Sequence, residues 1–285
     1  MVRDLRGKRM VITGCSSGIG RAVAEGAAAR GARLVLAARS TDKLEEVASQ
    51  LRQTGVEALA VTADVTGEED RRRLIDTAVG HLGGLDVLVN NAGVASFGHF
   101  AGSSEAVLRQ VMDVNFFAPA ELIRLAIPHL TRGQQPAIVN VSSMCGRRGM
   151  PAWPEYSASK FALCGLTEAL RGEMVRFGID VLLVLPGLTR SELSRHMLRN
   201  EGRMKISFDD GMEPAWVAAG ILQGLERNRT ETVLGRDTRW MLRVNKFLPR
   251  LVDRLLARRV RKLYAGETSS PTPPAAANPS VAGRG

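Results

Sequence analysis

The stretch RMVITGCSSGIGRAVAEGAAARG, residues 9–31, decides the fold of this chain. Its first five residues are an apolar run that predicts a buried strand, and its last eleven have the composition of a helix. Glycines at such a turn let the backbone approach a pyrophosphate, to which the helix N-terminus offers free N–H groups. The alternative is a merely tight turn. The candidate phosphate-binding residues are Gly14, Ser16, Ser17, Gly18, Ile19 and Gly20.

Similar apolar runs recur along the chain, at residues 32–37, 58–62, 85–90, 137–142, 179–185 and 231–235. They are continuous rather than alternating, which is typical of strands buried on both faces of a parallel sheet. Helical stretches separate them. The sequence therefore predicts an α/β fold with a single Rossmann-like, doubly wound, parallel seven-stranded sheet and helices on both faces.

The composition of the 285 residues, 45% hydrophobic and 24% charged, excludes disordered, collagen-like and small disulfide-rich proteins. We expect one domain over residues 1–235, a basic amphipathic helical extension over 236–265 and a disordered tail over 266–285. The three cysteines, without a CxxC pair, and the lack of a signal peptide predict a reducing, cytoplasmic setting.

The residue that follows the second predicted strand indicates the cofactor. A dinucleotide-binding unit normally has an acid there to bind the ribose hydroxyls. Here Arg39 occupies the place, 19 residues beyond Gly20. Because a guanidinium binds a 2′-phosphate that a carboxylate would repel, we expect NADP(H) rather than NAD. The alternative is an exposed charge at a strand end.

Four motifs, in this order, resemble those of the classical short-chain dehydrogenases/reductases over roughly residues 5 to 235. They are G-x-x-x-G-x-G at 14–20, DV at 64–65, NNAG at 90–93 and YSASK at 156–160. Each is weak alone, but their joint order and separation are specific. The resemblance implies a catalytic domain over 1–235, hydride transfer between a nicotinamide cofactor and a carbonyl or secondary alcohol, and a homodimer or homotetramer.

The same resemblance implies roles for residues that follow the strands. Asp64, beside Val65, contacts the adenine, and Thr189 reaches the nicotinamide carboxamide. Ser191 stands where the family usually has a threonine, and we expect its hydroxyl to keep a phosphate contact. The other residues assigned to the cofactor groove are Asn91, Ala92, Gly93, Pro186 and Gly187.

The candidate catalytic residues are Asn115, Ser143, Tyr156 and Lys160. Tyr156 and Lys160 share one face of a predicted helix. A free tyrosine has a pKa near 10, and an ammonium about 4 Å away supplies about 4 kcal/mol toward lowering it. We expect Lys160, helped by the positive nicotinamide of the oxidised cofactor, to make Tyr156 acidic, and also to hold the ribose hydroxyls.

By the resemblance, Ser143 binds the substrate oxygen and Asn115 holds a water that leads to Lys160. Ser142, one residue away on the strand, should point elsewhere. The alternatives are a capped helix start for the serines and a polar residue bonded to the backbone for Asn115. Tyr156 would act as general acid toward a carbonyl and as general base toward an alcohol.

The loops expected to roof the substrate are residues 94–100, 144–153 and 191–212. Their large apolar side chains include Phe97, Met144, Met150, Trp153 and Met197. They favour a small apolar carbonyl or alcohol as substrate, unless they merely pack under the loops. No metal site is expected, because the histidines are far apart in the sequence: His81, His99, His129 and His196.

Residues 239–262 carry nine basic side chains against Asp253 alone, so most of the net charge of +10 lies there. Val244, Leu251 and Leu255 recur at helical spacing, which predicts a basic amphipathic helix, bent or restarted at Pro249. Such a helix can dock on its own subunit, join an oligomer or lie on an anionic membrane at the inner face of the cell. Because the charge is local, nucleic acid is not expected as a partner.

Two alternatives to the leading interpretation stay open. One is a ketoacyl reductase of the same family, although these typically have Arg-Asp shortly after NNAG, where this chain has VASFGHF. The other is a non-catalytic, NADP-sensing or membrane-peripheral binding protein.

Overall fold

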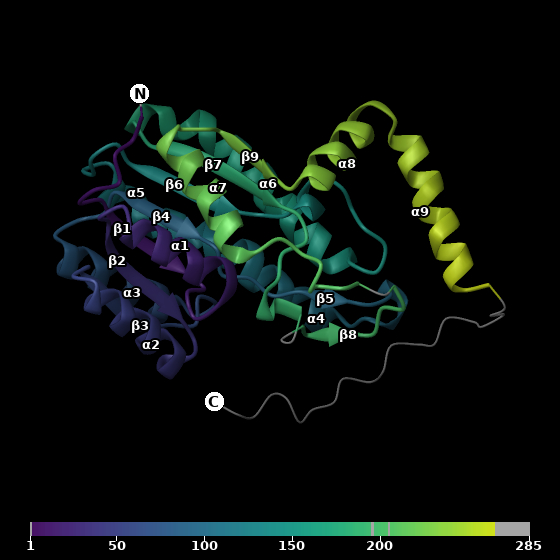
Figure 1. Cartoon of the computed structure of the whole chain (residues 1–285), viewed down its shortest axis with the longest axis horizontal. Coiled ribbons are helices and arrows are strands. Elements are labelled where there is room, and N and C mark those ends of the chain that lie inside the picture. Colours follow the sequence, from purple (N-terminus) through teal and green to yellow (C-terminus); the bar gives the residue numbers. More distant parts are fainter. Residues whose placement is uncertain (1, 195–196, 205, 266–285) are drawn as a thin grey trace.

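The structure, a computed structural model, describes residues 2–194, 197–204 and 206–265. Seven parallel strands form one sheet in the order β3-β2-β1-β4-β6-β7-β9 (Figure 1), which confirms the predicted fold class. The strands are β1 (Arg9–Thr13), β2 (Arg33–Ala38), β3 (Ala58–Thr62), β4 (Val87–Asn90), β6 (Ala137–Val141), β7 (Asp180–Pro186) and β9 (Glu231–Leu234). Each lies within one or two residues of its predicted run.

Both faces of the sheet are buried, as the continuous apolar runs predict. In β1, Met10 and Ile12 belong to one hydrophobic cluster and Val11 belongs to the other, because successive side chains point to opposite faces. Helices α1 (Gly18–Ala28), α2 (Thr41–Gln53) and α7 (Pro214–Glu226) cover the first face. Helices α3 (Glu68–Leu82), α5 (Ala118–Leu130) and α6 (Pro154–Met174) cover the second.

The strand order reverses between β1 and β4, and this reversal positions the site. The chain moves from β1 outward to β3 and returns to β4 on the other side of β1. A crevice opens where the carboxyl ends of such strands diverge. The glycine turn after β1 and the Asn91 loop after β4 therefore meet at one place.

A second, two-stranded parallel sheet was not predicted. Its strands β5 (Ser96–Phe97) and β8 (Arg199–Asn200) have two residues each and join the loop after β4 to the segment after β7. Strands this short leave no alternating pattern in the sequence. The remaining short elements are α4 (Glu105–Met112), a π-helical turn (Asp113–Phe117) and the 3-10 turns Phe100–Gly102, Met144–Gly146, Val175–Phe177 and Glu192–Ser194.

Residues 236–263 form two helices, α8 (Arg236–Phe247) and α9 (Pro249–Leu263), with the break at Pro249 that the sequence predicts. We call this segment the basic arm. Val252, the most buried side chain of α9, is 7% exposed, and Arg148 pairs with Asp253 to hold the helix against the body. No helix in the described part of the chain is long and apolar enough to cross a membrane. The predicted disordered tail, 266–285, lies outside the described residues.

An ion pair between Arg9 and Asp86 joins the amino ends of two central strands, at the end of the sheet opposite the crevice. The Asp86 carboxylate accepts hydrogen bonds from the Arg9 side chain at 2.7 and 3.0 Å and from the Arg9 and Gln134 backbone N–H groups at 2.9 and 2.6 Å. Burial opposes the charge, but these donors hold the pKa of Asp86 below its ordinary value. This carboxylate therefore joins β1, β4 and the loop before β6.

Candidate active site

The glycine turn is shaped by close packing as well as by backbone conformation. Gly14 and Gly18 have φ angles of +73° and +57°, in the left-handed region that favours glycine. At Gly20 a Cβ atom would lie 2.1 Å from the Gly14 carbonyl oxygen and 2.5 Å from Asn91 Nδ2. Asn91 Nδ2 donates to the carbonyls of Thr13 and Gly14 at 2.9 and 3.2 Å, which fixes the turn against β4.

The turn leaves the N-terminus of α1 open to an anion. Ser17 is the N-cap residue but its side chain makes no capping hydrogen bond, and the first turn contains no acidic residue. The free N–H groups and the positive end of the helix dipole therefore face the crevice without an internal counter-charge. Ser191 lies over the same turn, since its Cβ is 3.4 Å from the position of a Cβ on Gly18.

One cavity of about 560 Å³ runs along the carboxyl ends of the strands and collects the predicted cofactor residues. The predicted residues that line it are Gly14, Ser16, Ser17, Gly18, Ile19, Gly20, Arg39, Asp64, Val65, Asn91, Ala92, Gly93, Ser143, Tyr156, Lys160, Pro186, Gly187 and Thr189. Asn115 is absent from the lining. The cavity thus has room for an extended ligand that starts at Arg39 and ends at Tyr156.

Lys43 lines the same cavity near Arg39, and sequence reasoning missed it. It lies one helical turn beyond Arg39, at the start of α2, and this spacing could have indicated it. Lys43 pairs with Glu192 at 3.1 Å, whereas Arg39 has no ion-pair partner among the described residues. The part of the cavity near the end of β2 therefore has two cations, and among the described residues only Lys43 has an ion-pair partner.

Helix α6 brings the tyrosine and the lysine to the other end. The Tyr156 ring packs edge-on against Trp153, with centroids 5.6 Å apart. Ser143, two residues beyond the end of β6, lines the same cavity as Tyr156, and its Oγ accepts from the Cys145 N–H at 3.1 Å. Ser142 points away, since its Oγ donates to the Lys160 carbonyl at 3.1 Å.

Asn115 lies behind this cavity in the π-helical turn between α4 and α5. Its Oδ1 accepts from the Val94 N–H at 2.9 Å, and its Nδ2 donates to the Val94 carbonyl and to Ser159 Oγ, both at 2.9 Å. All side-chain atoms of Asn115 capable of hydrogen bonding are therefore engaged. It connects the loop after β4 to α6, while Lys160 Nζ donates to the Val141 carbonyl at 3.1 Å.

In the protein without a cofactor, the pKa of Tyr156 is raised rather than lowered. Burial is the main cause that raises the pKa of the phenol above its ordinary value of 10.0, and the hydrogen bond from Ser143 offsets this only in part. Lys160 Nζ lies 5.8 Å from the centre of the Tyr156 ring, and burial lowers the pKa of Lys160 from 10.5 to about 8. Because the positive nicotinamide of the oxidised cofactor is part of the expectation, the acidity of Tyr156 in the cofactor-bound enzyme stays a prediction.

The three thiols are buried and their protonated forms are favoured. Burial raises the pKa of Cys15 to about 12 and that of Cys145 to about 11, and it also raises the pKa of Cys164. Cys145 lines the cavity beside Ser143. Because a thiolate is the reactive form, these side chains are inert in the folded protein.

The substrate end of the cavity is apolar, but two of the predicted roof residues are not part of it. Phe97 is 4% exposed and stacks on Trp153 at 4.9 Å, and Met197 is absent from the cavity lining. Phe97 lies under the loop because its strand pairs with β8. The apolar residues that do line this end include Met144, Met150, Trp153, Leu188, Leu193, Ile206 and Phe208.

The turn after β7 also lines the cavity. Thr189 is 7% exposed and its Oγ1 donates to the Gly187 carbonyl at 3.1 Å. A Cβ on Gly187 would lie 2.0 Å from Thr238 Oγ1, so this turn packs directly on the start of α8. Within the described residues no three His, Cys, Asp or Glu side chains are grouped to hold a metal ion, and His196 lies outside those residues.

Comparison with known proteins identifies the family to which the chain belongs. The family described as short chain dehydrogenase matches residues 8–202 of the chain. The chain belongs to the short-chain dehydrogenase family. The expectation from the four motifs is thereby confirmed, and the chain is an oxidoreductase whose typical cofactor is a nicotinamide dinucleotide, NAD or NADP.

Relatives and solved structures agree with this family. The chain is 34% identical over 259 residues to the uncharacterized oxidoreductase YxnA of Bacillus subtilis, a match that covers 90% of this chain and 73% of YxnA. It is 27% identical to a short-chain dehydrogenase/reductase from Burkholderia phymatum in complex with NAD, with a TM-score of 0.76 and coverage of 96% and 99%. It is 26% identical to an alcohol dehydrogenase from Thermococcus sibiricus complexed with 5-hydroxy-NADP, with a TM-score of 0.71 and coverage of 80% and 95%.

Proposed function

We propose that this short-chain dehydrogenase interconverts a carbonyl and a secondary alcohol on a small apolar substrate, with NADP(H) as preferred cofactor. The observation that carries the proposal is that Ser143 and Tyr156 line the apolar end of a cavity whose other end is a cationic, glycine-shaped crevice. A dinucleotide and a carbonyl compound need these two ends in one continuous space.

The residues of the crevice fit the dinucleotide. The pyrophosphate would lie against the N-terminus of α1, which has neither a capping side chain nor an acidic residue in its first turn. Lys160 would hold the nicotinamide ribose hydroxyls, and Asp64 the adenine. The dinucleotide, when bound, supplies or accepts the hydride, and the protein contributes position and proton transfer.

The preference for NADP(H) is supported by the cations at the adenosine end. The uncommitted Arg39 follows β2, where an acid would otherwise bind the ribose hydroxyls. Its guanidinium can form charge-assisted hydrogen bonds to a 2′-phosphate, and Lys43 adds a second charge nearby.

Proton transfer at the substrate oxygen is assigned to Tyr156. Ser143 would donate a hydrogen bond to that oxygen and orient it, while the protonated phenol of Tyr156 delivers a proton during reduction. In the reverse direction the phenolate accepts the alcohol proton. The raised pKa of Tyr156 favours the protonated form, which is the form that carbonyl reduction needs.

The substrate is assigned an apolar body by the methionine, leucine and aromatic side chains around this oxygen site. Trp153 is held on Phe97 and Tyr156, so it provides a rigid apolar wall. Such a lining excludes water from the reacting atoms and favours an apolar substrate over a carboxylate or phosphate.

The experiment is a screen of ketones, aldehydes and secondary alcohols with NADPH, NADH and their oxidised forms. We expect turnover of apolar carbonyl compounds with NADPH, and a loss of at least about 100-fold in kcat for Tyr156→Phe with nearly unchanged NADPH binding. Tyr264→Phe, the other tyrosine of the chain, is the matched control. Tight NADPH binding without turnover of any compound would favour the non-catalytic alternative, and full activity of Tyr156→Phe would overturn the proton-transfer assignment.

A further inference from the structure

The basic arm presents apolar side chains to solvent. Its two helices meet at a bend that stands clear of the sheet and its covering helices (Figure 1). Phe247, Leu248 and Leu251 flank this bend and are 75%, 54% and 43% exposed. We call these three residues the apolar apex. Trp240 and Leu255, on either side of the apex, are 68% and 51% exposed.

These residues are not the face by which the arm packs on the body. Helix α9 packs through Val252 and the half-buried Leu256 and Val260, over an apolar hollow beside α6. Helix α8 packs through Thr238, which is 5% exposed, and Leu242. Because these contacts already anchor the arm, the apex has no packing role within the described chain.

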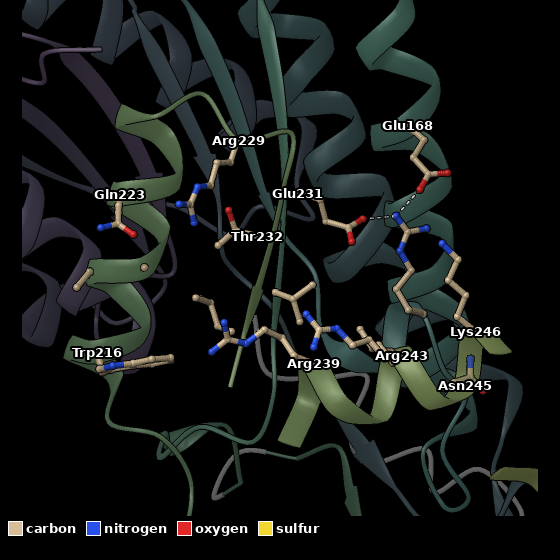
Figure 2. A pocket seen from close by; sticks show the side chains of 16 residues that line it. Glu168, Trp216, Gln223, Arg229, Glu231, Thr232, Arg239, Arg243, Asn245 and Lys246 are labelled. Carbon is tan, nitrogen blue, oxygen red and sulfur yellow. Dashed lines mark hydrogen bonds and ion pairs between the residues drawn. The ribbon is translucent and has the colours of Figure 1, made fainter. Parts of the chain in front are cut away.

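Basic side chains flank the apex along both helices, and two of them contact uncharged groups: Arg239 Nε donates to the Gly235 carbonyl at 3.3 Å, and Lys246 Nζ lies 5.8 Å from the centre of the Phe247 ring. Among the described residues, none of the nine Arg and Lys side chains of 239–262 pairs with a carboxylate, and the single acid, Asp253, turns inward to Arg148. Figure 2 shows Arg239, Arg243 and Lys246 along one side of α8, where they line a cleft beside β9. The carboxylates drawn there, Glu168 and Glu231, are both engaged by Arg147.

We propose that the basic arm docks on an anionic lipid surface, with the apolar apex inserted among the acyl chains and the flanking cations at the lipid phosphates. The combination of positive charge and exposed apolar side chains on the basic arm favours a lipid surface over other partners. Nucleic acid would match the charge but leave Phe247, Leu248 and Leu251 in water. A second copy of the arm would cover the apolar residues but would oppose a net charge of +8 with the same charge. Only an anionic amphiphilic surface satisfies both features.

The arrangement of the side chains fits insertion at an interface. Large apolar residues at a convex bend can enter a monolayer without moving the body of the protein. Arginine and lysine stems next to them can extend to the phosphates while their apolar parts remain buried. The docking does not depend on the reaction, so its test needs no substrate.

The test is co-sedimentation of the full chain with vesicles of phosphatidylcholine alone or mixed with phosphatidylglycerol. We expect at least ten-fold more bound protein on the anionic vesicles, and a decrease in binding as salt is raised. An apex variant, Phe247→Gln, Leu248→Gln and Leu251→Gln, should lose at least ten-fold. A charge variant, Arg243→Gln, Lys246→Gln, Arg250→Gln and Arg254→Gln, should lose the preference for anionic vesicles.

The matched control is Val2→Gln with Val175→Gln, which replaces apolar residues that are 72% and 74% exposed elsewhere on the surface. It should bind like the unmodified chain. Near-ultraviolet circular dichroism of every variant tests that the body remains folded. Equal binding of the apex variant and the unmodified chain would overturn the proposal. A change in oligomeric state of the apex variant by analytical ultracentrifugation, without any vesicle binding by the unmodified chain, would assign the surface to a second copy instead.

Discussion

At Arg39 a single side chain is expected to decide between the two dinucleotides. Replacement by Asp removes a charge-assisted partner of the 2′-phosphate and adds a repulsive charge. We expect the Kd for NADPH to rise by about 10- to 100-fold, while NADH binding stays equal or improves. Fluorescence titration with each reduced cofactor measures both changes.

Lys43→Gln is the control for this prediction. Its cation is already paired with Glu192, so its loss should weaken NADPH binding less than the loss of Arg39. Unchanged NADPH affinity of Arg39→Asp would remove the basis for the NADP(H) preference.

The Tyr156 phenol sets the pH dependence of the two directions. Its folded pKa lies above the ordinary value, so the phenol stays protonated as the pH rises through neutrality. Carbonyl reduction needs this form and should be flat between about pH 6 and about pH 8, whereas alcohol oxidation needs the phenolate and should rise about ten-fold per pH unit. Initial rates of both reactions across this range give the profile.

A flat profile for alcohol oxidation would contradict this prediction and show that the phenol becomes acidic when the cofactor binds. The sequence could not settle this point. It placed Tyr156 and Lys160 one turn apart, but the pKa depends on burial and on the direction in which the ammonium points, and both are set by packing around α6.

Between elements, a buried ion pair links the catalytic helix to β8. Glu155, adjacent to Tyr156, has a side chain with 0% exposure, and neither carboxylate oxygen has a hydrogen-bond partner in the described residues. Arg199 of β8 lies 3.9 Å away with 9% of its side chain exposed. Arg199 is the cation that approaches this buried carboxylate, and the same guanidinium also pairs with Glu201 at 2.5 Å.

Replacing Arg199 alone should lower the free energy of unfolding more than replacing Arg199 and Glu155 together. We expect Arg199→Gln to lower the free energy of unfolding by about 3 kcal/mol, because it leaves a buried charge uncompensated. The double variant with Glu155→Gln should recover part of that loss. Urea denaturation of the two single variants and the double variant completes the cycle, and additive losses would mean that the two side chains do not interact.

The sequence predicted those strands and helix ends that are specified by residues close together in the chain. The seven long strands are continuous apolar runs, and Pro249 divides α8 from α9 by simple chemistry. Strands β5 and β8 and the π-helical turn at Asn115 depend on partners more than twenty residues away. For that reason Phe97 was predicted at the roof of the substrate cavity and is found beneath it.

For the molecule as a whole, we expect the loss of Asp86, which lies far from the candidate active site, to lower the free energy of unfolding substantially. Asp86→Ala leaves Arg9 without its carboxylate and frees two backbone donors, so we expect the free energy of unfolding to fall by about 3 kcal/mol. The folded pKa of Asp86 is lowered, so its contribution is present above the unfolded pKa and is lost as the pH falls. Urea denaturation at about pH 7 and about pH 3 should show the difference from the unmodified chain shrinking at the lower pH.

Cofactor binding by the folded fraction of Asp86→Ala is the control, since the carboxylate lies at the end of the sheet opposite the crevice. An undiminished difference at low pH would assign the loss to packing rather than to charge. The fold class was predictable because the alternation of apolar strands and helices indicates a doubly wound parallel sheet. The Arg9–Asp86 ion pair could not be predicted from the sequence. Its two residues are 77 positions apart and come together only when β1 and β4 pair in the sheet.

The labelling rates of the three buried cysteines measure how often the protein opens locally. Because Cys15 and Cys164 are buried and Cys145 is reached only through the cavity, an added disulfide reagent reports how often each region exposes its sulfur. Cys15 is next to the glycine turn and Cys145 is next to Ser143, so a bound dinucleotide should slow their labelling more than that of Cys164. The rates would map ligand protection along the crevice without any introduced probe.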